Sequence, residues 1–218
     1  MLIIPSILSD SKTEIQLQAD ILSTQTGFSR VQVDIVDPEF ADNITLTPID
    51  FIDINLHNLE IEFHLMTNDP INDVVECSQV RGVKAIIAQI EHMPSQKDFY
   101  DHVNSYGFET GLSLDLYTPV EELDPEILEQ VSIVQVMGNK AGAQGKQFAG
   151  EVVLTKIHEL AKISQQQATP FQISVDIGMN SETILLCSQA GATVFVVGSY
   201  LWKAPNLEAA VEQLPINQ

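Results

Sequence analysis

The sequence predicts a (β/α)8 TIM barrel, and three observations support this fold class. Eight short runs of apolar and β-branched residues recur along the 218-residue chain, helix-length segments separate them, and several of these segments carry capping signals. Strands that alternate with helices pair in parallel, and eight such units fit a barrel at the compact end of its size range. An open doubly wound sheet is the alternative, but eight strands in series exceed the number usual there.

The predicted strands share short length and apolar character. They are Leu2–Leu8, Val31–Val36, Ile61–Met66, Ala85–Ile90, Gly111–Leu116, Ile133–Met137, Phe171–Ile177 and Thr193–Val197.

Three of the separating segments have clear helix signals. The segment after the first strand has an apolar stripe at helical spacing behind a capping Ser or Asp in 9–11, and residues 151–163 repeat that spacing. A third helix begins after Asn180 or Ser181 and ends at Gly191.

The amino-acid composition limits the classes of function that this protein can have. The chain has 10 Lys and Arg against 30 Asp and Glu, a net charge of −20, which argues against nucleic-acid binding. No apolar run approaches the roughly 18 residues of a membrane-spanning helix. Residues 1–218 are therefore expected to form one domain that is not a membrane protein, and we expect a cytoplasmic location with Cys77 and Cys187 as reduced core thiols.

Chemistry in either α/β architecture gathers at the carboxyl ends of the strands. Asp34, His64 and Asp176 lie at such positions on three different strands, so they could meet at one mouth. Two carboxylates and an imidazole suit metal coordination, or acid and base work on two sides of a carbon atom. The alternative is that each is a satisfied structural group, but three together favour function.

Glycines collect in the loops after the last three strands. Gly138, Gly142, Gly145 and Gly150 follow strand six together with Lys140 and Lys146, Gly178 follows strand seven, and Gly198 and Ser199 follow strand eight. Glycine allows close backbone approach to a ligand, and late loops are the usual phosphate cradle of such barrels. The pattern favours a phosphate site over loops that merely need turns.

An ordered set of motifs resembles the ribulose-phosphate 3-epimerase family, whose barrels are of the ribulose-phosphate-binding type. The motifs are PSILS at 5–9, VDxxDxxFxxN at 33–43, HLMxxxP at 64–70, VDxG at 175–178 and AGAxxxVxGS at 190–199. Each motif alone is weak, but together they span nearly the whole chain.

The resemblance implies interconversion of D-ribulose 5-phosphate and D-xylulose 5-phosphate. Asp34 and Asp176 match the two aspartates that act on opposite faces of C3, through an enediolate stabilised by a divalent metal such as zinc, iron, cobalt or manganese. Asp34, His64 and Asp176 match three metal ligands, and family members are commonly homo-oligomers. The implied contacts to the phosphorylated ketose are Ser6 (or less plausibly Ser9), His64, Met66, Met137, Gly142, Gly145, Gly178, Gly198 and Ser199.

Several departures from the family pattern fall in the site itself. Gln32 stands where the family has a fourth ligand, a histidine, and a neutral carboxamide is a poorer zinc ligand than imidazole. Gln89 also replaces a common histidine, and Ile177–Gly178 replaces a doubled glycine. The sequence thus indicates a divergent relative with altered metal or substrate dependence.

Three functions are consistent with these residues. A 3-epimerase for a pentulose or hexulose phosphate, such as allulose 6-phosphate, is favoured because both aspartates and His64 are present. A non-catalytic sugar-phosphate-binding paralogue is the second possibility, given the replaced ligand. A decarboxylase or aldolase is the third, and it is disfavoured because the segment 34–37 holds no lysine.

Overall fold

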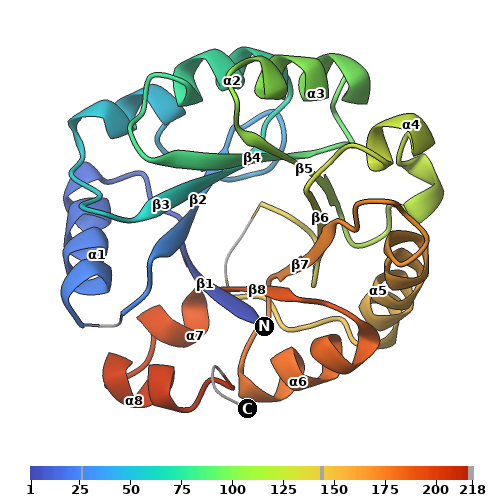
Figure 1. Ribbon diagram of the computed structural model, residues 1–218. Helices are drawn as coiled ribbons and strands as arrows, with labels where there is room; N and C mark the ends of the chain where they lie inside the picture. The colour runs from blue at the N-terminus through green and yellow to red at the C-terminus, as the bar shows by residue number, and fades with distance from the viewer. Residues whose placement is uncertain (26, 143–144, 216–218) are drawn as a thin grey trace.

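The computed structural model describes residues 1–25, 27–142 and 145–215 and shows a ring of eight strands surrounded by helices (Figure 1). Every strand pairs in parallel with its neighbour in the chain, and β8 pairs with β1 to close the barrel. The predicted (β/α)8 architecture is confirmed. The strands are β1 Leu2–Ile7, β2 Arg30–Val36, β3 Glu60–Met66, β4 Val83–Gln89, β5 Glu109–Leu114, β6 Ile133–Met137, β7 Gln172–Asp176 and β8 Val194–Val197.

The predicted helices are present, and side-chain hydrogen bonds cap the first turn of two of them. Ser11 Oγ accepts from the Glu14 N–H at the start of the first helix, and Asn180 caps the helix that ends at Gly191. The elements outside the barrel are α1 Lys12–Gln25, η1 Pro48–Asp53, α2 Pro70–Cys77, α3 Gln96–Ser105, η2 Val120–Glu122, α4 Pro125–Leu128, α5 Glu151–Ser164, α6 Ser181–Ala190, α7 Ser199–Trp202 and α8 Leu207–Glu212.

Alternation along each strand divides the core into two layers. On β2, Val33 and Ile35 belong to the apolar layer shared with the surrounding helices, whereas Gln32 and Asp34 are buried polar residues on the other face. Cys77 and Cys187 are buried free thiols, as expected. No helix among the described residues is long and apolar enough to cross a membrane.

Strand register brings the polar residues to one end of the barrel. Asp34 on β2 lies opposite His64 on β3, and Met137 on β6 lies opposite Asp176 on β7. Ser6 on β1 lies beside Gln32 on β2. The parallel strands therefore place these side chains at a common, carboxyl-terminal mouth.

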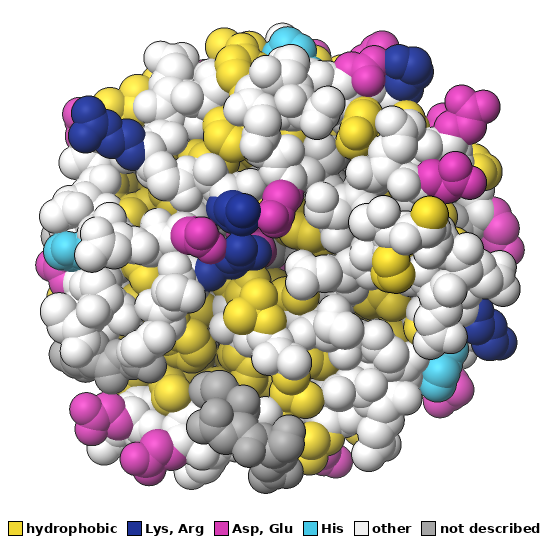
Figure 2. Space-filling model, viewed as in Figure 1, with side chains coloured by type: hydrophobic (Ala, Val, Ile, Leu, Met, Phe, Trp, Pro, Cys, Tyr) yellow, Lys and Arg dark blue, Asp and Glu magenta, His cyan; other side chains and the backbone are white. Residues whose placement is uncertain are grey.

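The opposite end of the barrel carries a different set of charges. Figure 2 shows basic and acidic side chains gathered in the middle of one face, and the ion pairs at the starts of β2 to β5 account for such a group. Arg30 pairs with Glu60 at 2.9 Å and with the buried Glu62 at 2.7 Å, and Lys84 pairs with Glu109 at 3.1 Å.

Candidate active site

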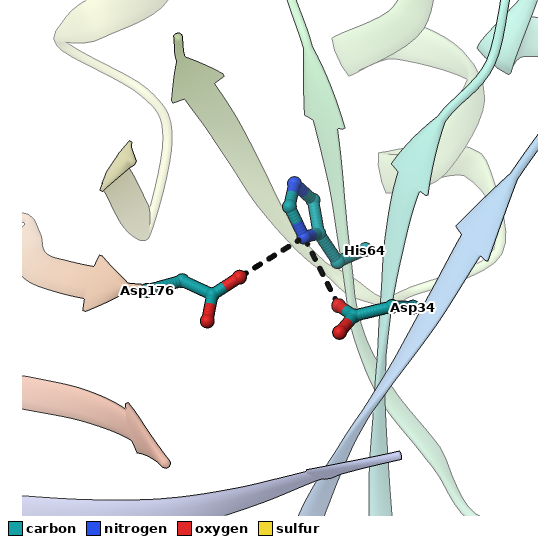
Figure 3. Close-up of side chains that lie close together, drawn as sticks. All are labelled: Asp34, His64 and Asp176. Atoms are coloured by element: carbon teal, nitrogen blue, oxygen red, sulfur yellow. Dashed lines mark hydrogen bonds and ion pairs between the residues drawn. The ribbon is translucent and has the colours of Figure 1, made fainter. Parts of the chain in front are cut away.

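Three buried side chains from three strands converge at the mouth. Figure 3 shows Asp34 and Asp176 extending from opposite sides toward the ring of His64. His64 Nδ1 lies 3.2 Å from Asp34 Oδ1 and 3.8 Å from Asp176 Oδ2. One potential ligand atom from each residue lies within 4.8 Å of the other two. The group therefore joins the three residues that the sequence singled out.

Two carboxylates this close in a buried site cannot both ionise easily. Burial raises the pKa of Asp176 to about 7, and the negative charge of Asp34 adds to the rise, while His64 and the Ile177 N–H oppose it. Asp176 can therefore keep its proton near neutral pH. A carboxyl group in this state can act as an acid as well as a base.

Amide side chains inside the barrel contact two of the three residues, Asp34 and His64. Gln32 Nε2 donates to Asp34 Oδ1 at 3.0 Å. Gln89 Nε2 lies 3.1 Å from His64 Nε2 and donates to Ser113 Oγ at 2.9 Å. In this arrangement His64 Nε2 accepts a hydrogen bond, so Nδ1 carries the proton and donates it to Asp34.

The buried oxygens Gln32 Oε1 and Gln89 Oε1 have no hydrogen-bond partner among the described residues. Buried acceptors without a partner are costly, and these two oxygens are available to accept a hydrogen bond from a ligand or to bind a cation. If the Gln89 amide turned over, Oε1 would accept from His64 Nε2, and Nδ1 would offer its lone pair to a cation.

A cavity opens directly above Asp34 and Asp176. Most of the predicted site residues line it: Ser6, Asp34, Met66, Met137, Gly142, Gly145, Asp176, Gly178, Gly198 and Ser199. Gln32 and His64 do not line it; both are fully buried and contact Asp34, which does. Ile177, which the sequence marks as the replacement of a family glycine, lines it as well. Leu8, Met179 and Val196 also line it, and their apolar character gave no signal of a site in the sequence.

The loops after β2, β6 and β7 contact one another at this cavity, and glycines make the contact possible. A Cβ on Gly142 would lie 2.3 Å from Ala41 Cβ, and a Cβ on Gly178 would lie 2.5 Å from the Phe148 nitrogen. Asn43 Nδ2 also donates to the Gly142 carbonyl at 3.0 Å. These glycines are thus required for close contact between loops, in addition to any role at a ligand.

Comparison with known proteins shows the family of this chain. The model of the ribulose-phosphate 3-epimerase family matches residues 2–202. The chain belongs to the ribulose-phosphate 3-epimerase family. The epimerase of Chlamydia pneumoniae is 28% identical over 211 residues, which cover 95% of this chain and 90% of the relative. The cytoplasmic isoform of Oryza sativa is 29% identical over 206 residues, covering 93% and 87% of the two chains.

Solved structures support the fold of this family member. A 3-hexulose-6-phosphate synthase has a TM-score of 0.65 at 14% identity and covers 98% of both chains. The orotidine 5′-phosphate decarboxylase of Pyrococcus horikoshii has a TM-score of 0.61 at 16% identity, covering 97% of this chain and 96% of its own. At such low identity these neighbours show the barrel alone.

The donor set of this epimerase-family chain fits a divalent cation. Asp34, His64 and Asp176 offer two carboxylates and one imidazole, which zinc, iron, cobalt and manganese all accept. Gln32 lies beside them, and its buried Oε1 has no partner among the described residues. The orphaned oxygen and the tight cluster together make the site suitable for a metal.

The lysine that lies close to Gly145 is not one of the two lysines that the sequence pointed to. Of the two lysines in the described part of the β6 loop, Lys146 donates to the Lys140 carbonyl at 2.8 Å. Lys203, which the sequence analysis did not single out, has its Nζ 2.9 Å from the position of a Cβ on Gly145. The only feature of the sequence that pointed to Lys203 was its position four residues after Ser199, because Lys203 belongs to no motif.

Proposed function

We propose that this chain is a 3-epimerase that interconverts D-ribulose 5-phosphate and D-xylulose 5-phosphate. The observation that carries the proposal is the approach of Asp34 and Asp176 from opposite sides toward one point beside His64 (Figure 3). Inversion at a carbon beside a carbonyl needs a base on one face and an acid on the other. The curated relatives carry this name, and the family match supports the same reaction.

The two aspartates exchange roles with the direction of reaction. In one direction an ionised Asp34 removes the C3 proton, and the electron pair moves onto the C2 carbonyl oxygen to give an enediolate. Asp176 then gives its proton to C3 from the other face, and the C2 carbonyl forms again. Burial supports this division, because it raises the pKa of Asp176 to about 7 and keeps a proton there.

A divalent metal would be held by Asp34, His64 and Asp176, with Gln32 as a neutral fourth group. When bound, such an ion polarises the carbonyl and lowers the cost of negative charge on the substrate. Gln89 fixes the plane of the His64 ring through its contact with Nε2. Gln32 holds Asp34 in place through its contact with Oδ1.

The remaining cavity residues would bind the rest of the ketose phosphate. The phosphate group would be bound by backbone N–H groups in the loops after the last three strands, at Gly145, Gly178, Gly198 and Ser199. Lys203, whose Nζ lies close to Gly145, would add a positive charge there. Met66 and Met137 belong to an apolar cluster that covers the reacting end. Low polarity there strengthens each electrostatic contact to the substrate.

Solvent-deuterium incorporation at C3 of D-ribulose 5-phosphate, followed by NMR in D2O, tests the proposal. The chelated protein is compared with protein given zinc, iron(II), cobalt or manganese. We expect exchange with formation of xylulose 5-phosphate, stimulated by at least one metal. A folded protein that gives no exchange with any metal contradicts the epimerase proposal.

Gln32, at the position where the resemblance implies a histidine ligand, supports a second candidate, a sugar-phosphate-binding paralogue without turnover. Calorimetric binding of ribulose 5-phosphate in the absence of exchange would favour this candidate. Gln32→His distinguishes the two further, because we expect it to raise metal affinity and any metal-dependent exchange. Unchanged metal content in that variant would place Gln32 outside the coordination sphere.

A single domain over residues 1–218, a homo-oligomeric state and a cytoplasmic location remain predictions. Light scattering on the eluting protein measures the oligomeric state directly, and limited proteolysis tests the single domain. Cell fractionation tests the location.

A further inference from the structure

Asp115 connects three segments at the carboxyl end of the barrel. It follows β5 directly and does not line the cavity. Its Oδ1 accepts from the Ala141 N–H at 2.7 Å and from the Leu116 N–H at 2.8 Å. Its own N–H donates to Glu91 Oε1 at 2.7 Å, and its carbonyl oxygen accepts from Lys156 Nζ at 2.7 Å. One residue thus joins the loop after β4, the loop after β6 and helix α5.

The contact with Lys156 fixes the backbone of Asp115. Lys156 is buried, and its Nζ also donates to the Leu116 carbonyl at 3.1 Å. Burial lowers the pKa of Lys156, and the negative charges nearby, of which Glu91 and Asp115 are the strongest, oppose this fall. Because a buried ammonium needs partners, it stabilises the backbone that supplies the two carbonyl groups. The carboxylate of Asp115 therefore extends from a fixed point of the scaffold.

The segment that Asp115 holds belongs to the wall of the cavity at its reacting end. Ala141 is buried and packs in the same apolar cluster as Met66, which lines the cavity. Gly142, the next residue, lines the cavity itself. The Gly142 carbonyl accepts from Asn43 Nδ2 at 3.0 Å. The start of the β6 loop is thus held by Asp115 through one peptide group and by Asn43 through the next.

We propose that Asp115 is a positioning residue that holds Ala141 and Gly142 over the reacting carbon and so keeps water from the proton-transfer step. This inference rests on the proposed epimerase function. A proton that Asp34 has taken from C3 returns to C3 unexchanged when the site is closed to water. In an open site the same proton exchanges with solvent before it returns. Loss of the hydrogen bond to Ala141 would open the site in this way.

The test follows two products of one reaction in D2O at low conversion, with the metal that best supports C3 exchange. The deuterium found at C3 of recovered D-ribulose 5-phosphate is divided by the xylulose 5-phosphate formed. Asp115→Ala removes the acceptor of the Ala141 N–H, and Asp115→Ser is too short to supply one. We expect each variant to raise this ratio about threefold or more and to lower kcat about tenfold, because small displacements at a site act on this scale. A mere loss of folded protein would lower kcat and leave the ratio unchanged.

Two further variants control for the change of charge and for the loss of a capping carboxylate. Asp115→Asn keeps an oxygen that accepts from Ala141, so the ratio and kcat should stay within about twofold of the unaltered protein. Asp124→Ala is the matched control, because Asp124 is also half-buried and accepts from the Glu126 N–H at 2.9 Å. Neither Asp124 nor Glu126 lines the cavity, and this variant should leave both quantities unchanged.

Failure of this inference differs from failure of the proposed function. Active alanine and serine variants whose ratio equals that of the unaltered protein overturn the role of Asp115. An unaltered protein that never incorporates deuterium at C3 overturns the epimerase proposal instead. In that case amide hydrogen exchange of Ala141, measured by NMR, decides whether Asp115 holds the segment. We expect exchange about tenfold faster in the alanine and serine variants than in Asp115→Asn, and equal rates would remove Asp115 from this role.

Discussion

Strands β2 and β3 carry buried charged groups at both ends of the barrel, and the partners of the buried carboxylates differ between the two ends. At the amino end, the buried Glu62 receives a hydrogen bond from Arg30 at 2.7 Å. At the carboxyl end, the buried Asp34 and Asp176 share the His64 imidazole and have no Lys or Arg ion-pair partner among the described residues. At the amino end a permanent cation pairs with the buried carboxylate, whereas at the other end no Lys or Arg of the described residues does so.

This difference in partners distinguishes the Arg30 cluster, which has a structural role, from the carboxylates at the mouth, which can take part in a reaction. A guanidinium keeps its charge at every accessible pH, so Glu62 always has a charged partner in Arg30. The carboxylates at the mouth instead can gain a proton or bind a cation, and both events change the reactivity of the site.

The largest effect is expected from removing a carboxylate at the mouth. Asp34→Asn and Asp176→Asn should each lower kcat by about 10³-fold or more, because an amide neither accepts nor returns the C3 proton. C3 deuterium exchange measures this. Glu62→Gln is the matched control, since it alters a buried carboxylate at the other end and should leave kcat within about twofold. A normal rate in either Asp variant would remove that residue from the mechanism.

The second prediction concerns stability. Arg30→Met should lower the free energy of unfolding by about 3 kcal/mol, because it leaves Glu62 buried without its partner. Burial already raises the pKa of Glu62 above its ordinary value, and Arg30 opposes that rise. A raised folded-state pKa means that stability falls as pH rises through it, so the loss in Arg30→Met should be greater at pH 8 than at pH 5.

Urea unfolding at the two pH values checks this expectation. Combining Arg30→Met with Glu62→Gln removes the unpaired charge and should restore part of the stability, with less dependence on pH. A loss in Arg30→Met that is equal at both pH values would show that Glu62 does not take up a proton.

The third prediction concerns the support of His64. Gln89→Leu should weaken metal binding by about tenfold, because His64 Nε2 loses the partner that orients the ring. Competition with a chelator measures this change without reference to activity. Gln135→Leu is the matched control: Gln135 is equally buried but contacts Ser174 rather than His64. An equal loss in both variants would point to a general effect of the buried amides.

The smallest effect is expected at the rim of the cavity. Lys203→Gln should raise KM for ribulose 5-phosphate by about fivefold with little change in kcat, since an exposed cation contributes on the order of 1 kcal/mol. Raising the salt concentration should reduce this difference by screening. Lys162→Gln, in the last turn of α5, serves as control. If KM is the same with and without Lys203, its closeness to Gly145 has no role in substrate binding.

The sequence by itself determined the barrel and most of its mouth. Apolar runs alternating with helical segments require parallel strands, and the polar residue at the end of each run then falls at one edge. Asp34, His64 and Asp176 could be selected for this reason, and so could the glycines of the late loops. Chemical type and position along a strand are properties that a sequence displays directly.

Only the tertiary structure decided how these groups are partnered. Lys203 reaches the Gly145 loop because α7 follows β8 directly, whereas Lys146 turns to the Lys140 carbonyl. The orphaned oxygens of Gln32 and Gln89 and the place of Leu8 and Met179 in the cavity lining have no signature in the sequence. Each depends on which segments meet across the barrel. Closure of the sheet, rather than local sequence, decides which segments meet.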